Sequence, residues 1–433
     1  MNRRQFLQQS GLAALAVPTF IPARVLGRDG ATPPSEKLTI ALIGCGGMGE
    51  ADSSHQHKLG QSQFIAFCDV DKTRRDAKKA EFENLYSGEA GRSRHRGIAT
   101  YNDFRELLAR DDLDAVIIAT PEHWHGIPVI EAAKMGKDIY CEKPLAFTVR
   151  EGRAMVEAVR RYGSVLQTGS QQRSQGEFRH ACELVRNGYI GAVHTIYVRV
   201  GGPSHNCRLP AEPTPEGMDW NLWIGQAPYR PFNHSIHPRN WRNYSDFAGG
   251  GTSDWGAHHF DIVQWALDMD NSGPVEFLPP GTDGHPCLGI RYACGTMVYH
   301  VFGPAENRVP WPSPPQGDSY GITFVGDKGW IEVDRAHIRA EPKRILHATI
   351  GETEQRLFRS PDHHLNWLDC IRSRQRPICD VEVGHRSATI CRLANICHWT
   401  QQRFAWDPLH EQITDNPYAA RWLDRARRAP WTI

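Results

Sequence analysis

Two polar residues spaced by four positions form one pairing in this chain that could carry out acid–base chemistry. Asp254 and His258 would share one face of a helix, and Asp261 would fall on that face too. A carboxylate beside an imidazole can form a general base with an orienting partner. The alternatives are a metal pair, or a capping aspartate beside a core histidine. We expect no metal site, because the sequence has no HExxH motif and no third ligand clustered nearby.

A glycine-rich turn forms the second chemical motif. Gly44, Gly46 and Gly49 lie between an apolar segment and an expected helix, and Gly47 and Met48 complete the turn. Such glycines let the backbone approach a pyrophosphate at a helix N-terminus. The motif therefore predicts a dinucleotide cofactor.

Asp69 follows the second apolar segment and could bind the ribose hydroxyls of that cofactor. Its charge would repel a 2′-phosphate, so the sequence favours NAD over NADP. An alternative role for Asp69 is to cap the helix that starts near Lys72. Lys72 and Arg74 lie close enough to keep NADP as the less favoured cofactor.

Two further motifs follow apolar segments and should lie at the ligand-binding edge of a parallel sheet. In the first, Thr120 and Pro121 should line the cofactor site, as His125 would unless it is only a hydrogen-bonded residue at a helix start. Glu122 and His123 are expected to be solvent-facing turn residues.

The second of these motifs is Glu142-Lys143-Pro144. Glu142 and Lys143 would contact the cofactor, and Lys143 could touch both the nicotinamide side and a substrate hydroxyl. Beside a positively charged nicotinamide ring, the pKa of the lysine should fall, which suits proton relay. On spacing alone, a surface lysine before a loop proline is the competing interpretation.

Alternating strands and helices between residues 36 and 165 predict a doubly wound parallel sheet, the Rossmann arrangement. The expected strands are 38–43, 64–68, 115–119, 138–141 and 165–169. The expected helices begin at Gly49 and cover 72–84, 101–109, 125–135 and 148–161, with a basic loop at 90–99.

Residues 166–433 show a different pattern from residues 36–165, because their expected strands follow one another without intervening helices. This pattern predicts an α+β domain with an open, mainly antiparallel sheet, so the whole chain is of the α/β class. A long insert at 201–250 is typical of a functional loop. The expected strands are 193–200, 288–293, 296–302, 321–325 and 330–333; helices near 254–267, 363–375 and 384–403 should cover one face, and another lies near 177–187.

In their order along the chain, the motifs GCGGMG, CDVD, ATPEHWH, CEKPL and GGGTSDWGAHHFD resemble the Gfo/Idh/MocA oxidoreductases. The resemblance implies that Lys143, Asp254 and His258 form the catalytic site, with His258 as the base on a substrate hydroxyl. It extends to a bacterial subgroup with export signals. For the substrate we expect contacts from Gln171, Arg173, Trp241 and His259, and a sugar could stack on Trp220, Trp223, Trp241 or Trp311.

The first 35 residues resemble a twin-arginine export signal and linker. Arg3 and Arg4 precede an apolar stretch, Gly11 to Ile21, that is too short to span a bilayer. We therefore expect a periplasmic or cell-envelope enzyme that is exported folded and retains its cofactor. The formal net charge of +1 argues against nucleic acid as a partner.

The eleven cysteines show no CxxC spacing and are expected to be mainly buried thiols, firmly so at Cys45, Cys68 and Cys141. A homo-oligomer through the open sheet is expected.

The sequence therefore predicts an NAD-dependent oxidoreductase acting on a sugar, glycoside or polyol hydroxyl. One alternative is redox-neutral glycoside cleavage or epimerisation through a transient keto sugar. Another is a non-catalytic protein that binds a sugar or cofactor, against which the intact Lys143, Asp254 and His258 argue.

Overall fold

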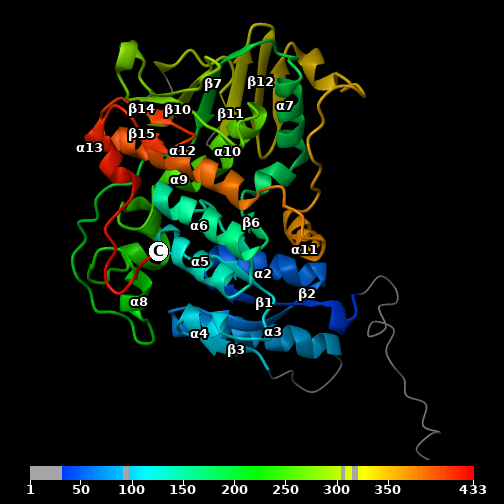
Figure 1. Cartoon of the computed structure of the whole chain (residues 1–433), viewed down its shortest axis with the longest axis vertical. Coiled ribbons are helices and arrows are strands. Elements are labelled where there is room, and N and C mark those ends of the chain that lie inside the picture. Colours follow the sequence, from blue (N-terminus) through cyan, green and yellow to red (C-terminus); the bar gives the residue numbers. More distant parts are fainter. Residues whose placement is uncertain (1–31, 91–96, 304–307, 315–319) are drawn as a thin grey trace, which may run out of the picture.

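Two open sheets lie one above the other in the computed structural model, with helices packed between and around them (Figure 1). The structure describes residues 32–90, 97–303, 308–314 and 320–433. The export-signal motif and most of the expected basic loop at 90–99 lie outside the described residues. None of the helices in these ranges has the length and apolarity that crossing a membrane requires.

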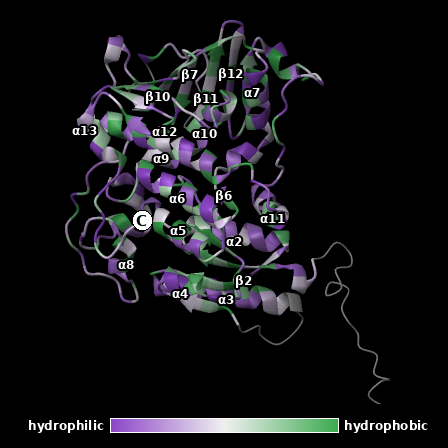
Figure 2. Ribbon diagram, viewed as in Figure 1, coloured by the Kyte–Doolittle hydropathy of each residue, from purple (hydrophilic) through white to green (hydrophobic). Residues whose placement is uncertain are grey.

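The lower sheet is parallel throughout and has the order β3-β2-β1-β4-β5-β6. Its strands read as apolar runs because helices cover both faces (Figure 2). This confirms the Rossmann prediction. The strands are β1 (Leu38–Ile43), β2 (Ser62–Cys68), β3 (Ala99–Tyr101), β4 (Ala115–Ile118), β5 (Asp138–Cys141) and β6 (Leu166–Thr168).

Helices alternate with these strands much as expected, with one addition. Residues 99–101 add a strand, so α4 begins only at Phe104. Strand β6, expected at 165–169, pairs with β5 and completes the sheet. The helices are α2 (Gly47–Leu59), α3 (Lys72–Ala90), α4 (Phe104–Leu108), α5 (Gly126–Lys134) and α6 (Val149–Tyr162), with a short helical turn, η4, at Glu122–Trp124.

Local signals define the ends of α6. The Thr148 hydroxyl accepts a hydrogen bond from the Glu151 N–H, which is one half of a capping box. Gly163 ends the helix in the left-handed conformation at φ 71°.

The upper sheet is mixed and mainly antiparallel, with the order β13-β12-β11-β7-β10-β9-β8-β14-β15. Its one parallel pair in the described ranges joins β7 to β10. The expected strands are present, and β8, β13, β14 and β15 are additional. The strands are β7 (Val193–Arg199), β8 (Glu276–Leu278), β9 (Leu288–Arg291), β10 (Met297–Val301), β11 (Gly321–Gly326), β12 (Gly329–Asp334), β13 (Ile338–Glu341), β14 (Phe404–Asp407) and β15 (Gln412–Ile413).

Helices α7 (Gly176–Arg186), α10 (Gly256–Ala266) and α12 (Val381–Thr400) share one apolar core with the upper sheet. Helix α12 also packs on α6, so it joins the two halves of the molecule (Figure 1). The expected helix at 254–267 is divided into α9 (Gly251–Asp254) and α10, with Trp255 between them.

Helix α11 (His363–Ser373) does not cover the upper sheet as expected. It packs on the lower sheet, where Trp367 and Leu368 are fully buried in the same cluster as Ile40 and Phe64. Figure 1 shows it beside α2. The apolar face of a helix indicates that it is buried but does not identify the sheet that covers it.

The 201–250 insert is mostly irregular and folds back toward the lower sheet. It contains α8 (Trp220–Ile224) and two short turns, η6 (Ser235–Asn240) and η7 (Trp241–Asn243). The Asp219 N–H donates to the Val70 carbonyl at 2.9 Å, and the Lys72 N–H donates to that of Gly217 at 3.0 Å. The insert therefore covers one side of the sheet edge at which β2 ends.

A buried ion network links the segment after β6 to α10. The Arg173 guanidinium donates to Asp261 Oδ2 at 2.7 Å and to Asp270 Oδ1 at 2.7 Å. The Arg173 and Asp261 side chains are 1% and 0% exposed. Breaking such a pair leaves an uncompensated charge in the interior.

We predict that Arg173→Met lowers the free energy of unfolding by about 3–5 kcal/mol, because Asp261 loses its buried partner. The matched control is Arg291→Met, whose ion pair with Glu276 is partly exposed and should contribute about 1 kcal/mol or less. Urea unfolding of both variants measures the difference. Equal losses would contradict a structural role for the Arg173 network.

Candidate active site

The glycine turn connects β1 to α2 through very close backbone contacts. Gly44 has a φ of 96°, and a Cβ there would lie 2.7 Å from the Ala119 carbonyl carbon. A Cβ on Gly49 would lie 2.0 Å from the Gly44 carbonyl oxygen. A Cβ on Gly47 meets nothing within 4 Å. Gly44 and Gly49 therefore shape the turn, whereas Gly47 leaves open space at the N-terminus of α2, as a pyrophosphate requires.

Asp69 faces this turn from the end of β2. Its Oδ2 accepts from the Cys45 N–H at 2.7 Å and its Oδ1 from the Asp71 N–H at 2.9 Å. Burial raises the pKa of Asp69, and the two backbone N–H groups oppose that rise. Arg74 lies close by, with Nη1 3.1 Å from the position of a Cβ on Gly46. The edge thus presents both a carboxylate for ribose hydroxyls and a guanidinium.

A cavity of about 390 Å³ opens above the turn. Its lining joins the ends of β1, β2, β4 and β5 to the insert. From the expected cofactor residues it includes Gly44, Gly46, Gly47, Met48, Asp69, Thr120, Pro121, His125, Glu142 and Lys143; from the second domain it includes His237, Trp241, Arg242 and Asp254. The residues present therefore fit an extended dinucleotide whose far end reaches Lys143.

Lys143 and Asp254 meet at that far end. The lysine Nζ donates to Asp254 Oδ1 at 2.7 Å and to the Asp254 carbonyl at 3.0 Å. Arg242 Nε lies 3.3 Å from the same Oδ1. Burial raises the pKa of Asp254, but the charges of Lys143 and Arg242 outweigh it and leave the pKa below its usual value. Asp254 is therefore ionised.

His258 lies one turn further along, on α10. Its side chain is buried, and Nδ1 has no hydrogen-bond partner among the described residues. Burial, followed by the positive charges of Lys143 and Arg335, holds the pKa of His258 well below its usual value. The imidazole is therefore neutral at pH 7, the state that a general base requires.

The expected carboxylate–imidazole pair does not form as a hydrogen bond. In the described part of the chain, Asp254 bonds Lys143 and Arg242, and Asp261 bonds Arg173 and Ser387. The break at Trp255 offsets the helical register on which the pairing depended.

Two buried glutamates lie beside the pair. Burial, followed by the charge of Asp52, raises the pKa of Glu142 to about 8. Burial likewise raises the pKa of Glu122 to about 7, although Glu122 Oε2 accepts from the Gly249 N–H at 2.9 Å. Both carboxyls are thus protonated in part near neutral pH.

The expectation that Glu122 and His123 face solvent is wrong. Both are buried, because the insert covers this turn. His123 Nε2 lies 3.0 Å from the Trp223 carbonyl. Trp223 itself stacks on Trp220 with ring centroids 4.5 Å apart, within the cluster beneath the insert. Both tryptophans are buried in this cluster, and Trp223 also lines the cavity, whereas Trp220 does not.

His125 ties together the two loops at the sheet edge. Its Nδ1 lies 2.8 Å from the Pro144 carbonyl and its Nε2 lies 2.9 Å from the Thr120 carbonyl. With both nitrogens engaged, His125 holds the loop that carries Lys143 and is poorly placed to act as a base.

The expected substrate residues separate into two groups. Trp241 lines the cavity, with the Arg242 guanidinium 4.3 Å from its ring centroid. Arg173 is fully engaged in its ion network, and His259 Nδ1 lies 3.1 Å from the Trp255 carbonyl. Gln171 is partly buried in the turn before α7. The structure therefore corrects the role of Arg173 from substrate contact to structural support.

Sequence reasoning missed Arg242, Gln172 and Arg335. With its amide oriented so that the nitrogen faces the His258 carbonyl, Gln172 donates to that carbonyl at 3.0 Å and accepts from Arg335 Nε at 3.2 Å. Arg335 lies in the turn between β12 and β13, and no motif marks it. Gln172 lies between Gln171 and Arg173, which were expected to contact the substrate, but only the fold brings it to His258. Across the described ranges, no group of three or more His, Cys, Asp or Glu side chains is arranged to hold a metal ion.

Family comparisons agree with this architecture. The model described as the oxidoreductase family with an NAD-binding Rossmann fold matches residues 38–170, and the C-terminal alpha/beta domain of that oxidoreductase family matches 200–286 and 321–433. The chain belongs to the Gfo/Idh/MocA oxidoreductase family. Two curated relatives each align with about two thirds of this chain.

Inositol 2-dehydrogenase from Rubrobacter xylanophilus is 32% identical over 69% of this chain and 72% of the relative. The rhizopine catabolism protein MocA from Rhizobium meliloti is 26% identical over 65% and 81%. Among solved structures, the aldose-aldose oxidoreductase from Caulobacter crescentus superposes with a TM-score of 0.56 at 19% identity, covering 85% of this chain and 99% of the other. That likeness concerns the fold.

The glycine turn gives a prediction that separates folding from cofactor binding. Gly49→Ala should lower the free energy of unfolding by a few kcal/mol, because its Cβ would meet backbone that cannot move aside. Gly47→Ala should leave unfolding unchanged and weaken NAD binding, because Gly47 lines the cavity. Urea unfolding without cofactor and titration calorimetry with NAD measure the two effects. A stable Gly49→Ala protein, or unaltered NAD binding by Gly47→Ala, would contradict the assignment.

Proposed function

We propose that this protein is an NAD-dependent oxidoreductase that acts on a hydroxyl group of a sugar, glycoside or polyol. The observation that carries the proposal is the position of the Lys143–Asp254 ion pair, which lies at the end of the cavity that begins at the glycine turn. The inositol dehydrogenase relative supports this substrate class.

In the proposed reaction, His258 accepts the hydroxyl proton. Its neutral state suits that role, and it lies close enough to Lys143 for the charge of the lysine to lower its pKa. Lys143 donates a hydrogen bond to the reacting oxygen and stabilises negative charge there as the proton leaves. Asp254 orients the lysine through the 2.7 Å contact. Bound NAD supplies the hydride acceptor.

The choice of NAD over NADP rests on Asp69, whose carboxylate faces the turn and would repel a 2′-phosphate. Arg74 is the residue that would favour NADP.

Redox-neutral chemistry is the second candidate. The same groups could oxidise a ring hydroxyl, acidify the neighbouring C–H, eliminate a glycosidic substituent and return the hydride. A specific observation favours it: a glycosyl hydrolase family 109 protein from Shewanella pealeana is 30% identical over 37% of this chain and 37% of that protein. Product formation from a glycoside without added NAD would distinguish this cycle from net oxidation.

We further propose that the enzyme is exported by the twin-arginine route to the periplasm or cell envelope and retains its cofactor. The support is the Arg3-Arg4 motif beside an apolar segment, in a chain whose dinucleotide turn requires folding before cofactor capture. Assembly through the open upper sheet remains part of this proposal.

The catalytic assignment predicts that Lys143→Ala, Asp254→Asn and His258→Ala each slow reduction of bound NAD. For His258→Ala the loss should be about 10²- to 10⁴-fold, because general-base catalysis is removed. The combined effects should be strongly non-additive, because the three groups act as a unit. Single-turnover absorbance at the NADH band with a reactive sugar measures the rates.

The matched control is His398→Ala, a buried histidine of α12 whose Nε2 contacts His300. It should keep the parent rate in the folded fraction. Parental reduction by His258→Ala would show that the base is assigned wrongly.

Cofactor retention predicts that protein purified through gel filtration carries nucleotide close to one per chain. Denaturation followed by mass spectrometry identifies the nucleotide. Release of NADP would overturn the role given to Asp69, and the absence of stoichiometric nucleotide would overturn tight retention.

A further inference from the structure

Arg335 is fixed in place by the turn that carries it. Strands β12 and β13 pair through Val333 and Ile338, and Asp334 begins the connection between them. Asp334 Oδ1 accepts from the Ala336 N–H at 2.7 Å and from the His337 N–H at 2.8 Å. A buried carboxylate that holds two backbone N–H groups makes the turn rigid, so Arg335 projects from a defined position.

The guanidinium lies against Trp255, the residue between α9 and α10. Its central carbon is 4.5 Å from the centroid of the Trp255 ring, and Nε contacts the Gln172 amide that bonds the His258 carbonyl. This cation–π contact restricts where the guanidinium can lie. Arg335 is exposed. Among the described residues it forms no ion pair, whereas Lys143 and Arg242 both pair with Asp254.

The charges around Asp254 do not balance. Lys143 and Arg242 both pair with this one carboxylate, and Arg335 adds a third positive charge that interacts with Asp254 and Glu142. Glu142 and Glu122 compensate only in part, because burial raises the pKa of each to about 8 and about 7. His258 and His259 contribute no charge, since burial lowers the pKa of both. Oxidised nicotinamide would add a further positive charge.

We infer that the substrate is an acidic sugar whose carboxylate is bound by the terminal nitrogens of Arg335 while its hydroxyl faces Lys143 and His258. A planar carboxylate matches the paired N–H groups of a guanidinium edge, and a neutral sugar would leave them unmatched. The inference rests on the proposed function and adds a substrate class to it.

The test compares matched sugars that differ at a single carbon. Glucuronate with glucose, and galacturonate with galactose, contrast a carboxylate with a hydroxymethyl group. Reduction of bound NAD gives kcat/KM for each, and the thermal shift of the cofactor-loaded protein reports binding without turnover. We expect the uronates to be preferred by both measurements, and Arg335→Gln to lower kcat/KM for uronates roughly 10- to 100-fold, mainly through KM.

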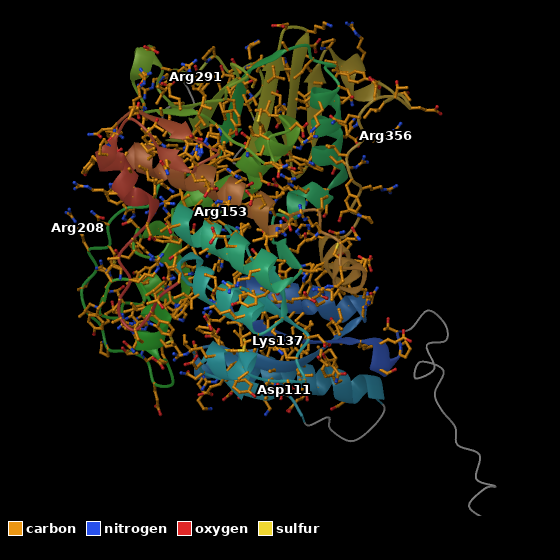
Figure 3. The ribbon with its side chains drawn as sticks, viewed as in Figure 1. Asp111, Lys137, Arg153, Arg208, Arg291 and Arg356 are labelled. Atoms are coloured by element: carbon orange, nitrogen blue, oxygen red, sulfur yellow. The ribbon has the colours of Figure 1, made fainter. Side chains whose placement is uncertain are left out.

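Two variants make the result specific. Arg335→Lys keeps the charge but loses the fork, and should restore only part of the activity with uronates. Arg208→Gln removes an equal charge from the outer edge of the insert (Figure 3), where Arg208 does not line the cavity, and should change nothing.

The outcomes separate this inference from the proposed function. Turnover of neutral sugars at equal or higher kcat/KM, with no effect of Arg335→Gln, would overturn the carboxylate subsite and leave the oxidoreductase standing. Uronate binding that depends on Arg335 without any reduction of NAD would support the subsite and overturn the oxidoreductase. A stronger shift with glucose 6-phosphate than with glucuronate would overturn the choice of carboxylate, and no shift with any acid would overturn the inference.

Discussion

The ion pair between Lys143 and Asp254 is the constraint on which the candidate active site depends. The lysine follows β5 in the lower sheet, and the aspartate ends α9 above it, 111 residues later in the chain. A contact of 2.7 Å requires both halves of the molecule to be placed accurately. Helix α12, which packs on α6, α9 and α10, provides that placement. The geometry of the candidate active site therefore depends directly on how the two halves of the molecule pack together.

Burial determines the charge state of nearly every group around this pair. Taken out of water, the carboxyls of Glu122 and Glu142 and the imidazole of His258 all shift toward their neutral forms. Of the three carboxyls Asp254, Glu122 and Glu142, it is Asp254 whose pKa lies below its usual value, because Lys143 and Arg242 face it directly. The site therefore holds one fixed negative charge among several cations, an arrangement that suits the stabilisation of a developing alkoxide.

The sequence predicted those features that depend on residue spacing along a short segment. It did not predict those that depend on contacts between distant segments. The glycines of the turn, the strand ends that carry Asp69 and Lys143, and most strands of both sheets follow from periodicity and turn residues. The burial of His123 depends on the insert one hundred residues away. Arg335 is brought to the site only by the pairing of β12 with β13, and α11 crosses to the lower sheet without any signal in its own residues.

The glycines at 249–251, which lead into α9 and Asp254, show how the fold limits the chemistry. Gly250 has a φ of 73°, and a Cβ on Gly251 would lie 2.4 Å from the Gly201 Cα. The start of α9 therefore rests directly on the backbone that leaves β7, with no room for side chains between them. Because Asp254 is only three residues beyond, any side chain in this contact would move the carboxylate away from Lys143. The run thus serves close packing against the protein's own backbone, and through that packing it sets the position of the ion pair.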